Sequence, residues 1–282
     1  MVSSPRDLIP IIDNLGYVIE EELATVLFLM LKLQKPLLLE GDPGVGKTQI
    51  GYILSEYLGY ELIRLQCYEG LDVNNAIYEW NYQKQLLAIK IHEHGSKSEG
   101  EKEDMIFGRE YLLERPLLKA ISSDKPCVLL IDEIDRSDEE FEAFLLELLS
   151  DFQISIPELS TIKAKNKPVV ILTSNRSREL SDALKRRCLY HWVDYPSMNK
   201  EMKIIKKHHP DIEEKLAEQI AQHIQDIRKL NLDKTPGVAE TIDWARGIAA
   251  LNGESDAMYK SLSCLLKSND DIKNVKEQLF NS

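Results

Sequence analysis

The sequence predicts an α/β fold, a parallel sheet covered by helices on both faces, followed by a smaller all-helical segment. Two observations predict the first part. Short apolar runs typical of buried strands alternate with segments of helical periodicity, and a glycine-rich turn joins the first strand to a helix. A third observation predicts the second part: after Pro196 the strand pattern stops and apolar residues recur at helical spacing. We therefore expect an α/β domain at 1–196 and a helical domain at 197–282.

The elements of the first part follow from these patterns in order. Strands are expected at 36–40, 61–66, 126–132, 169–174 and 189–195, and helices at 19–34, 48–59, 109–123 and 139–151. Pro116 should break or bend the third of these helices. Residues 67–104 are polar and irregular, with 94–104 as the most disordered-looking loop, and 153–167 has the pattern of a short hairpin.

The composition excludes several classes of protein. Lys and Arg number 35 against 47 Asp and Glu, a net charge of −12, which argues against general affinity for nucleic acid. No apolar run reaches the roughly 18 residues of a membrane span. The N-terminus lacks the layout of a secretion signal, so we expect a cytoplasmic protein. The four cysteines form no CxxC pair and are expected to be buried, reduced thiols.

The segment "GDPGVGKT" at 41–48 matches the phosphate-loop pattern G-x-x-x-x-G-K-[ST]. It follows an apolar strand and opens a helix, as that pattern requires. Its glycines let backbone N–H groups wrap phosphates, Lys47 reaches the β- and γ-phosphates, and the Thr48 hydroxyl ligates Mg²⁺. The nucleotide-binding residues expected in and beside this loop are Asp42, Gly44, Val45, Gly46, Lys47, Thr48 and Gln49.

A second motif, "VLLIDEID" at 128–135, ends an apolar strand in two adjacent carboxylates. Asp132 is expected to hold Mg²⁺ through its water shell, and Glu133 to orient and polarise the attacking water. Taken alone, the pattern equally fits an acidic turn after a strand. Beside a phosphate loop it indicates hydrolysis rather than storage of a nucleotide.

A third strand end, "VVILTSN", places Asn175 where its amide can hydrogen-bond the γ-phosphate or the water. The guanine-recognition pattern N-K-x-D is absent: the segment that comes nearest to it, "NKPV" at 166–169, has Val169 at the position of the Asp. ATP is therefore the expected nucleotide, with Mg²⁺ as its metal.

With these motifs in order, the whole chain resembles an AAA+ ATPase of the MoxR family, closest to the CoxD-like branch associated with carbon monoxide dehydrogenase maturation. The branch rests on longer matches at 64–90, 107–118, 181–196 and 236–245. The resemblance implies a P-loop NTPase sheet of order 5-1-4-3-2, a helical lid domain, and the hairpin before the fourth strand.

The same resemblance implies partners. Members of the family assemble, with ATP, into rings that are usually hexameric, and work with a protein that has a von Willebrand factor A domain. They act as chaperones that remodel or mature enzyme complexes, and a metalloenzyme such as a molybdenum hydroxylase is the candidate client here.

The resemblance also implies roles for single residues. Arg187 falls on the arginine-finger position that acts on a neighbouring subunit's nucleotide, with Arg186 as the alternative. Tyr17 and Val18 match the segment that contacts the adenine edge. One departure concerns the lid, where Gly237 stands at the place of a second phosphate-sensing arginine. Lys234 or Arg246 could reach the phosphates instead.

Two other functions stay open from the residues alone. A DNA-associated AAA+ motor or loader would use the same motifs, although the net charge and the lack of a basic stripe disfavour it. A nucleotide-gated scaffold with negligible turnover would not need the acidic pair. The segment 67–82, rich in aromatics and carboxylates, is either a loop packed on the sheet or an element that faces the substrate or the next subunit.

Overall fold

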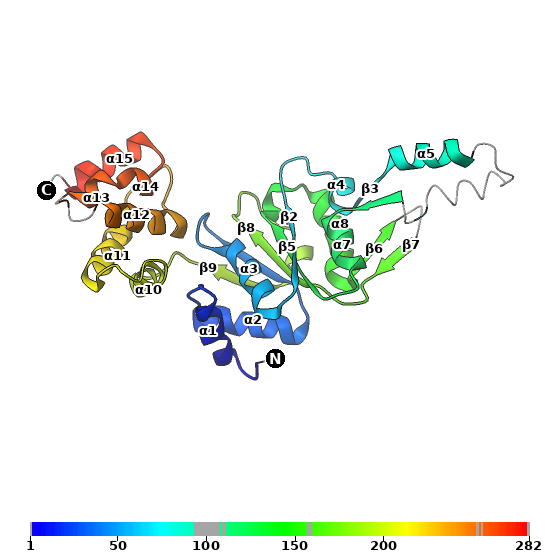
Figure 1. Ribbon diagram of the computed structural model, residues 1–282, viewed down its shortest axis with the longest axis horizontal. Coiled ribbons are helices and arrows are strands. Elements are labelled where there is room, and N and C mark those ends of the chain that lie inside the picture. The colour runs from blue at the N-terminus through cyan, green and yellow to red at the C-terminus, as the bar shows by residue number, and fades with distance from the viewer. Residues whose placement is uncertain are drawn as a thin grey trace. The chain divides into compact units, whose positions relative to one another are not determined.

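The computed structural model describes residues 2–92, 108, 111–156, 160–251, 254 and 256–280 (Figure 1). The disordered-looking loop expected at 94–104 lies outside these residues. The chain divides into two compact units that interleave along the sequence. One consists of Met1–Ala24, Gly41–Ile53 and Trp192–Ser282, and the other of Thr25–Glu40 and Leu54–His191. The domain boundary expected near 196–200 stays a prediction.

The central sheet has five strands in the order β2-β5-β8-β1-β9. The strands are β1 (Leu37–Gly41), β2 (Glu61–Gln66), β5 (Cys127–Asp132), β8 (Val169–Ser174) and β9 (Leu189–Val193). The pairs β1–β8, β5–β8 and β2–β5 are parallel, with Leu38 opposite Leu172 and Ile63 opposite Leu129. Numbered along the chain, this is the order 5-1-4-3-2, so the predicted fold is confirmed.

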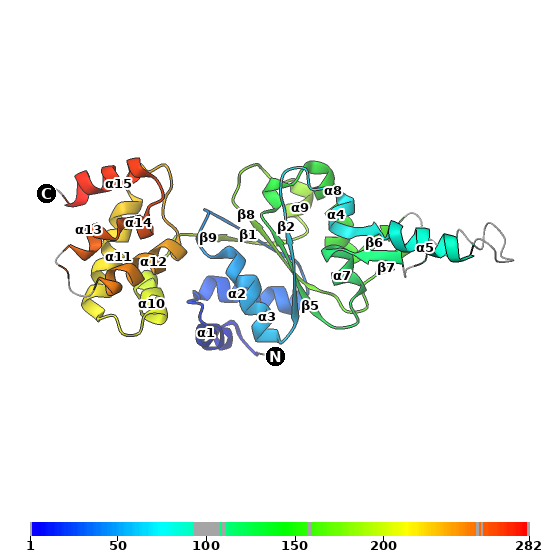
Figure 2. The same cartoon turned by 45° about the horizontal axis from the view of Figure 1, so that its top comes forward.

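The inner strands β1 and β5 are buried along their whole length because both faces of a parallel sheet are covered, whereas the edge strand β2 alternates between buried and exposed residues. On one face, a core cluster joins Leu38, Leu129 and Leu172 to Leu117 of α7 (Pro116–Ser122) and Leu148 of α8 (Glu139–Asp151). Figure 2 shows α2 (Glu21–Leu33), in blue, on the opposite side of the sheet from α8, in green.

The sequence prediction is wrong over part of 109–123. Within the described residues 111–123, α7 is the only α-helix, and it begins at Pro116, whose missing N–H costs nothing at the first helical position. The preceding Leu112–Glu114 forms β4, antiparallel to β3 (Tyr78–Trp80). Proline also keeps the residue before it extended, which ends any helix from the N-terminal side.

The expectation of irregular chain at 67–104 is also wrong for the described part. It contains α4 (Val73–Ile77), β3 and α5 (Tyr82–His92). Ala76, Ile77 and Trp80 are buried in the same core cluster as α7. Helix α4 and strand β3 are too short for a periodic pattern to reveal them, and the 11 residues of α5 do not gather their apolar side chains on a buried face. The predicted hairpin is confirmed as β6 (Gln153–Ile156) and β7 (Ser160–Lys163), which pair antiparallel.

Helix α5 presents an unusual surface for an acidic chain. Its exposed side chains include Tyr82, Leu86, Leu87, Ile89 and Ile91, each between 46% and 66% exposed. Only Gln85 and Ala88 of its described side chains are buried. An amphipathic helix would turn such residues toward a core, whereas those of α5 are exposed among the described residues.

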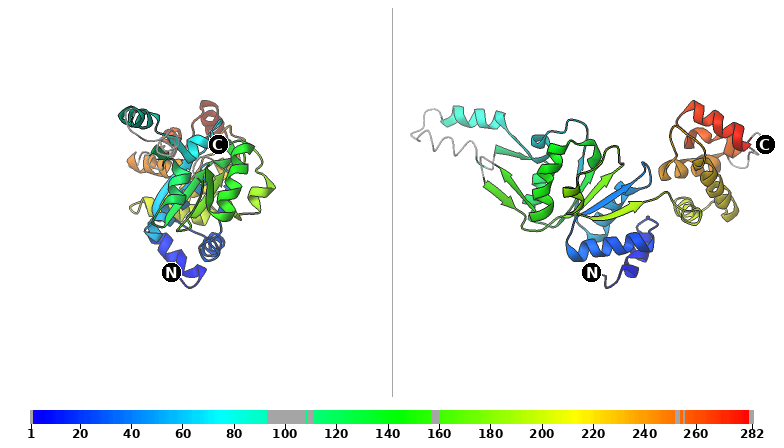
Figure 3. Two further views of the ribbon diagram at one scale, coloured as in Figure 1. Left: turned by 90° about the vertical axis from the view of Figure 1, so that its right-hand side faces the viewer. Right: turned by 180° about the vertical axis from the view of Figure 1, so that it is seen from behind.

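The other compact unit contains the helical C-terminal segment. Its helices are α10 (Met198–His208), α11 (Glu214–Arg228), α12 (Val238–Ala250), α13 (Ala257–Lys260), α14 (Leu262–Leu265) and α15 (Asn269–Val275), followed by η3 (Lys276–Phe280). These helices, yellow to red in Figure 3, share a core of their own that includes Ile205, Ile224 and Trp244. The same unit contains α1 (Pro5–Asn14), a helix that the sequence reading did not predict.

All four cysteines are free, as expected. Cys67 and Cys127 are buried, whereas Cys188 and Cys264 are only partly buried. Among the described helices, none combines the length and apolar character that crossing a bilayer requires.

Candidate functional site

The phosphate loop connects β1 to α3 (Lys47–Leu58). Gly44 and Gly46 have φ values of 81° and 97°, a region that glycine adopts without strain. The Lys47 side chain is only 5% exposed, and its Nζ donates to the carbonyl oxygens of Gly41 and Asp42, at 2.7 Å each. The loop therefore buries one cation at the start of a helix, an arrangement suited to binding phosphate.

Tyr17 lies against this loop within the same compact unit. A Cβ placed on Gly46 would stand 3.6 Å from Cε2 of the Tyr17 ring, so the ring covers the loop backbone. Burial, together with the charge of Glu20, raises the pKa of the Tyr17 hydroxyl. The predicted neighbour Val18 is partly buried. The structure thus brings one of the two expected adenine-contacting residues to the phosphate loop.

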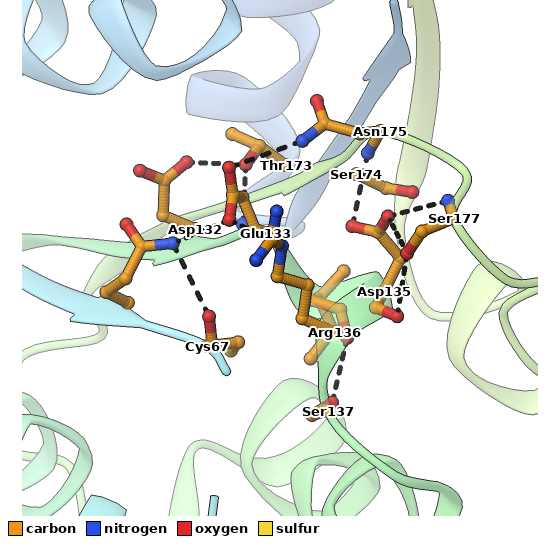
Figure 4. A network of polar contacts seen from close by, with 12 residues as sticks. Cys67, Asp132, Glu133, Asp135, Arg136, Ser137, Thr173, Ser174, Asn175 and Ser177 are labelled. Atoms are coloured by element: carbon orange, nitrogen blue, oxygen red, sulfur yellow. Dashed lines mark hydrogen bonds and ion pairs between the residues drawn. The ribbon is translucent and has the colours of Figure 1, made fainter. Parts of the chain in front are cut away.

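Asp132, the last residue of β5, is held on both carboxylate oxygens. The Thr173 hydroxyl donates to Oδ1 at 2.6 Å (Figure 4). The Arg64 guanidinium donates to Oδ2 from Nε, at 3.1 Å, and from Nη2. Only 2% of Asp132 is exposed, and these partners fix its carboxylate at the end of the strand.

Glu133 follows in the left-handed region, with φ of 56°. Such a conformation in a non-glycine residue costs of order 1–3 kcal/mol and recurs at functional sites. The Glu133 N–H donates to Thr173 Oγ1 at 2.9 Å, so one hydroxyl bridges both residues of the acidic pair.

The Glu133 carboxylate lies beside the predicted Asn175. The Asn175 amide donates to Oε1 at 3.3 Å, and Gln66 Nε2 and Arg136 Nε donate to Oε2 at 3.1 Å and 3.0 Å. The parallel neighbours β5 and β8 bring the two residues together, because their carboxyl ends lie at the same edge of the sheet. A carboxylate beside an amide can orient a water molecule and accept its proton.

A third carboxylate, Asp135, supports this edge, and the sequence analysis did not predict its role. Asp135 is 3% exposed and accepts hydrogen bonds from the Asn175 N–H at 3.1 Å and from Ser177 N–H and Oγ at 2.8 Å and 2.7 Å. Burial alone would raise the pKa of Asp135, but the Ser177 and Asn175 hydrogen bonds outweigh it and lower that pKa. In the sequence, Asp135 is the last residue of the motif "IDEID", and this position was the signal that could have indicated its role. In the structure, its carboxylate fixes the backbone that carries Asn175.

The thiol of Cys67 is buried near the same carboxylates. Burial, and then the charges of Asp132, Asp135 and Glu133, raise its pKa to about 12. A thiol with such a pKa stays protonated at neutral pH and does not act as a nucleophile.

The two finger candidates differ in their surroundings. Arg187 Nε donates to Ser150 Oγ at 2.6 Å, and its Nη1 donates to the Ala183 carbonyl at 2.8 Å. Its guanidinium is thereby anchored between the end of α8 and α9 (Asp182–Lys185). The Arg186 side chain is exposed and makes no hydrogen bond or ion pair within the described part of the chain.

The two residues expected to replace a phosphate-sensing arginine lie on exposed surface. Lys234 and Arg246 are both exposed. Arg246 lies close enough to His208 to contribute to its lowered pKa, after burial, His209 and Lys207. Gly237 itself contacts the phosphate loop through its backbone, since Val238 N–H donates to the Gly44 carbonyl at 2.9 Å.

Comparison with known proteins identifies the family. Residues 37–192 match the model of the ATPase family associated with various cellular activities (AAA). This chain is a member of the AAA family. As such it is a nucleotide-binding ATPase of the class that commonly forms rings, and the matched region contains the phosphate loop, the acidic pair, Asn175 and both finger candidates.

Two individual proteins are similar to parts of this chain. An uncharacterized protein of Staphylococcus aureus is 28% identical over 206 residues, which is 71% of this chain and 70% of that protein. Midasin of Giardia intestinalis is 43% identical over 47 residues, but these are 17% of this chain and 1% of midasin.

Solved structures of the RuvB protein of Thermotoga maritima show the same fold. One mutant form of RuvB has a TM-score of 0.54 at 19% identity, covering 93% of this chain and 71% of that one. A second mutant form has a TM-score of 0.52 at 18% identity, covering 99% and 72%. At this identity the likeness supports the AAA+ architecture and no particular substrate.

Proposed function

We propose that this chain hydrolyses Mg²⁺-bound ATP within a ring and uses the energy to remodel a protein client, as MoxR-type chaperones do. The observation that carries hydrolysis is the arrangement of Asp132, Glu133 and Asn175 around the Thr173 hydroxyl. Each polar side chain is held by named partners at one edge of the sheet. A protein that only stored nucleotide would not need an oriented carboxylate beside an amide.

In this proposal each motif has one task. The phosphate loop and Lys47 bind the phosphates, and Tyr17 and Val18 contact the adenine. Glu133 orients and deprotonates the attacking water, and Asn175 donates to the water or the γ-phosphate. The burial of Lys47 against the loop carbonyls and the hydrogen bond between Asn175 and Glu133 support these tasks.

The residues fit Mg²⁺ as the metal. A hydroxyl from Thr48 and a carboxylate from Asp132 are oxygen donors of the kind that Mg²⁺ prefers. The fixed orientation of Asp132 between Thr173 and Arg64 matches a group that holds a hydrated cation. When bound, the ion would neutralise charge on the phosphates, and the protein residues would position the nucleotide and the water.

We further propose that Arg187 completes the site of a neighbouring copy in a hexameric ring. Its anchoring through Nε and Nη1 supports this, since a group that stabilises a transition state works best when it is held in place beforehand. Nη2 is then the part of the guanidinium left to point at the neighbour's phosphates.

The client in this proposal is a protein, and a von Willebrand factor A domain protein is its adaptor. The exposed apolar side chains of α5 support a protein surface as the target. The net charge of −12 disfavours a nucleic acid backbone. A metalloenzyme such as a molybdenum hydroxylase remains the proposed client by resemblance to the CoxD-like branch.

The decisive experiment uses Glu133→Gln, which keeps the size and hydrogen-bonding shape of the side chain but removes the base. Turnover should fall about a hundredfold or more, while ATP binding persists and the ring accumulates. Phosphate release, nucleotide binding and light scattering measure these three properties. Glu139→Gln, at the exposed start of α8, is the matched control. Unchanged turnover in Glu133→Gln would refute the mechanism.

The same preparation tests the type of client. Affinity capture with the Glu133→Gln variant, with and without ATP, should enrich a protein partner. ATPase activity of the wild type should be insensitive to added duplex or single-stranded DNA at low salt. Salt-dependent stimulation by DNA would instead favour a DNA-associated motor.

A further inference from the structure

The N-terminus of α12 contacts the phosphate loop backbone to backbone. The Val238 N–H donates to the Gly44 carbonyl at 2.9 Å. A Cβ built on Gly237 would lie 2.7 Å from both Cα and O of Gly44. A Cβ built on Gly44 would likewise lie 2.9 Å from Cα of Gly237. All of these residues belong to one compact unit, and neither glycine leaves room for a side chain.

Space, not backbone conformation, explains the glycine at 237. Its φ of −87° and ψ of −170° are extended values that any residue adopts. An alanine there would meet the backbone of Gly44, which cannot give way as a flexible side chain can. The close approach itself is therefore the feature that this glycine permits.

A buried ion pair holds the contacting segment in place. Arg228 donates to both oxygens of Glu201, at 2.7 Å and 3.2 Å, and to the Pro236 carbonyl at 3.0 Å. Glu201 is 0% exposed, and the Arg228 guanidinium also stacks over the Tyr195 ring, 4.7 Å from its centroid. Because breaking a buried pair is costly, this network keeps Pro236 in a single position.

Two further hydrogen bonds orient the helix start. Thr241 Oγ1 donates to the Gly237 carbonyl at 3.1 Å, and the Glu240 carboxylate accepts from the Gly237 N–H at 3.1 Å. With the polar groups of Gly237 satisfied inside the helix, the Val238 N–H is the donor directed at Gly44. The loop carbonyls are thus engaged from two directions, by Val238 at Gly44 and by Lys47 at Gly41.

We propose that Gly237 and Val238 couple the phosphate loop to the lid helices, with Arg228 as the residue that positions them. This proposal rests on the phosphate loop binding ATP. Phosphates are bound by the N–H groups of the loop, so the orientation of the Gly44 peptide affects both the phosphates and the lid. Coupling of this kind is reciprocal: if the lid contact favours the binding conformation of the loop, bound nucleotide stabilises the contact. No lid side chain need reach the phosphates.

The test removes the contact in two independent ways. Val238→Pro deletes the donating N–H at the first position of α12, where proline is well tolerated. Gly237→Ala keeps the N–H but adds the Cβ that cannot fit. Glu214→Pro is the matched control, since it places proline at the exposed first position of α11. Circular dichroism checks that each variant folds. If one of the two variants does not fold, the other still tests the contact.

Two properties are measured. The first is the affinity for ATP and for ADP, and the second is the hydrogen exchange of peptides covering 236–250, compared with and without nucleotide. In the wild type and Glu214→Pro, nucleotide should slow exchange of these peptides. In Val238→Pro and Gly237→Ala, affinity should fall about three- to tenfold, as loss of one hydrogen bond predicts, and the nucleotide-dependent slowing should disappear.

The outcomes separate this proposal from the proposed function. If the wild type binds nucleotide and both variants match it in affinity and in protection of 236–250, the coupling is wrong and ATP binding stands. If the wild type binds no nucleotide under conditions where it is folded, both proposals fail.

Discussion

The Thr173 hydroxyl on β8 lies 2.6 Å from Asp132 Oδ1 on the neighbouring strand β5, and it also accepts the Glu133 N–H at 2.9 Å. One side chain thus sets the direction of the Asp132 carboxylate and the left-handed turn of the next residue. This bridge makes Thr173 a positioning residue for both members of the acidic pair.

Thr173→Val should therefore reduce turnover without unfolding the protein. Valine keeps the branched shape but leaves the Glu133 N–H without its acceptor. We expect a fall in kcat of about ten- to hundredfold, the range typical when groups that orient metal-associated residues are lost. The Mg²⁺ concentration for half-maximal activity should rise in parallel. Both follow from phosphate-release assays at varied Mg²⁺.

Thr161→Val on the exposed strand β7 serves as the control, because Thr161 hydrogen-bonds only with Ser155 among the described residues. Equal kinetics for Thr173→Val and Thr161→Val would contradict the bridging role.

Ser177→Ala should destabilise the fold in a pH-dependent way. The hydroxyl donates to the buried Asp135 carboxylate at 2.7 Å, and loss of a hydrogen bond to a charged group costs about 1.5–3 kcal/mol. Since the folded-state pKa of Asp135 lies below its ordinary value of 3.8, its stabilisation is present at pH 7. That stabilisation is lost as the pH falls through the folded-state pKa.

The difference in unfolding free energy between wild type and Ser177→Ala should accordingly be largest near pH 7 and narrow below about pH 4. Urea unfolding at pH values from 7 down to about 2 measures this difference, with the exposed Ser263→Ala as control. A difference that stays constant across this range would show that Ser177 does not act through the ionised Asp135.

The finger assignment can be decided by mixing inactive subunits. Arg187→Ala should lower turnover by about 10³–10⁵ while each subunit still binds ATP. Lys47→Ala should be inactive because it loses the phosphate-binding cation. Mixed together, the two variants should regain activity, since Lys47→Ala subunits still supply Arg187 to their neighbours.

Arg186→Ala is the informative comparison, because its side chain is exposed and unanchored. We expect it to retain most of its turnover. If Arg186→Ala is the inactive variant and Arg187→Ala the active one, the finger is Arg186 and Arg187 only joins α8 to α9. Absence of recovered activity in the mixture would argue against action between subunits.

The buried pair of Arg228 and Glu201 should dominate the stability of the C-terminal helices α10–α15. Arg228→Met leaves the 0%-exposed Glu201 carboxylate without its cation, and breaking a buried pair costs about 3–5 kcal/mol. Adding Glu201→Met should restore much of the loss, since the unpaired charge is then gone. Urea unfolding monitored by tryptophan fluorescence, Trp244 lying in this core, reports the effect. If the double variant is no more stable than Arg228→Met, the unpaired Glu201 charge is not the cause of the lost stability.

Much of this protein was determined by local sequence. The glycines and Lys47 of the phosphate loop, the run of buried residues ending at Asp132, and the alternation of strands and helices each follow from short-range rules of backbone conformation and burial. Strand order followed from a resemblance, and the structure confirms it. Asn175 could be placed because parallel strands end at one edge of a sheet.

Tertiary structure decided the rest, because it depends on contacts between residues distant in sequence. The segment that contains Leu112 has helical periodicity, but it forms a strand because it pairs with β3, where Trp80 lies opposite Leu112. Thr173 matters only because β8 lies beside β5. Gly237, which stands where the resemblance would place an arginine, is the point where the backbone at the start of α12 meets Gly44. No local sequence pattern predicts this contact, because its stability comes from the packing of two backbone segments that are far apart in the sequence.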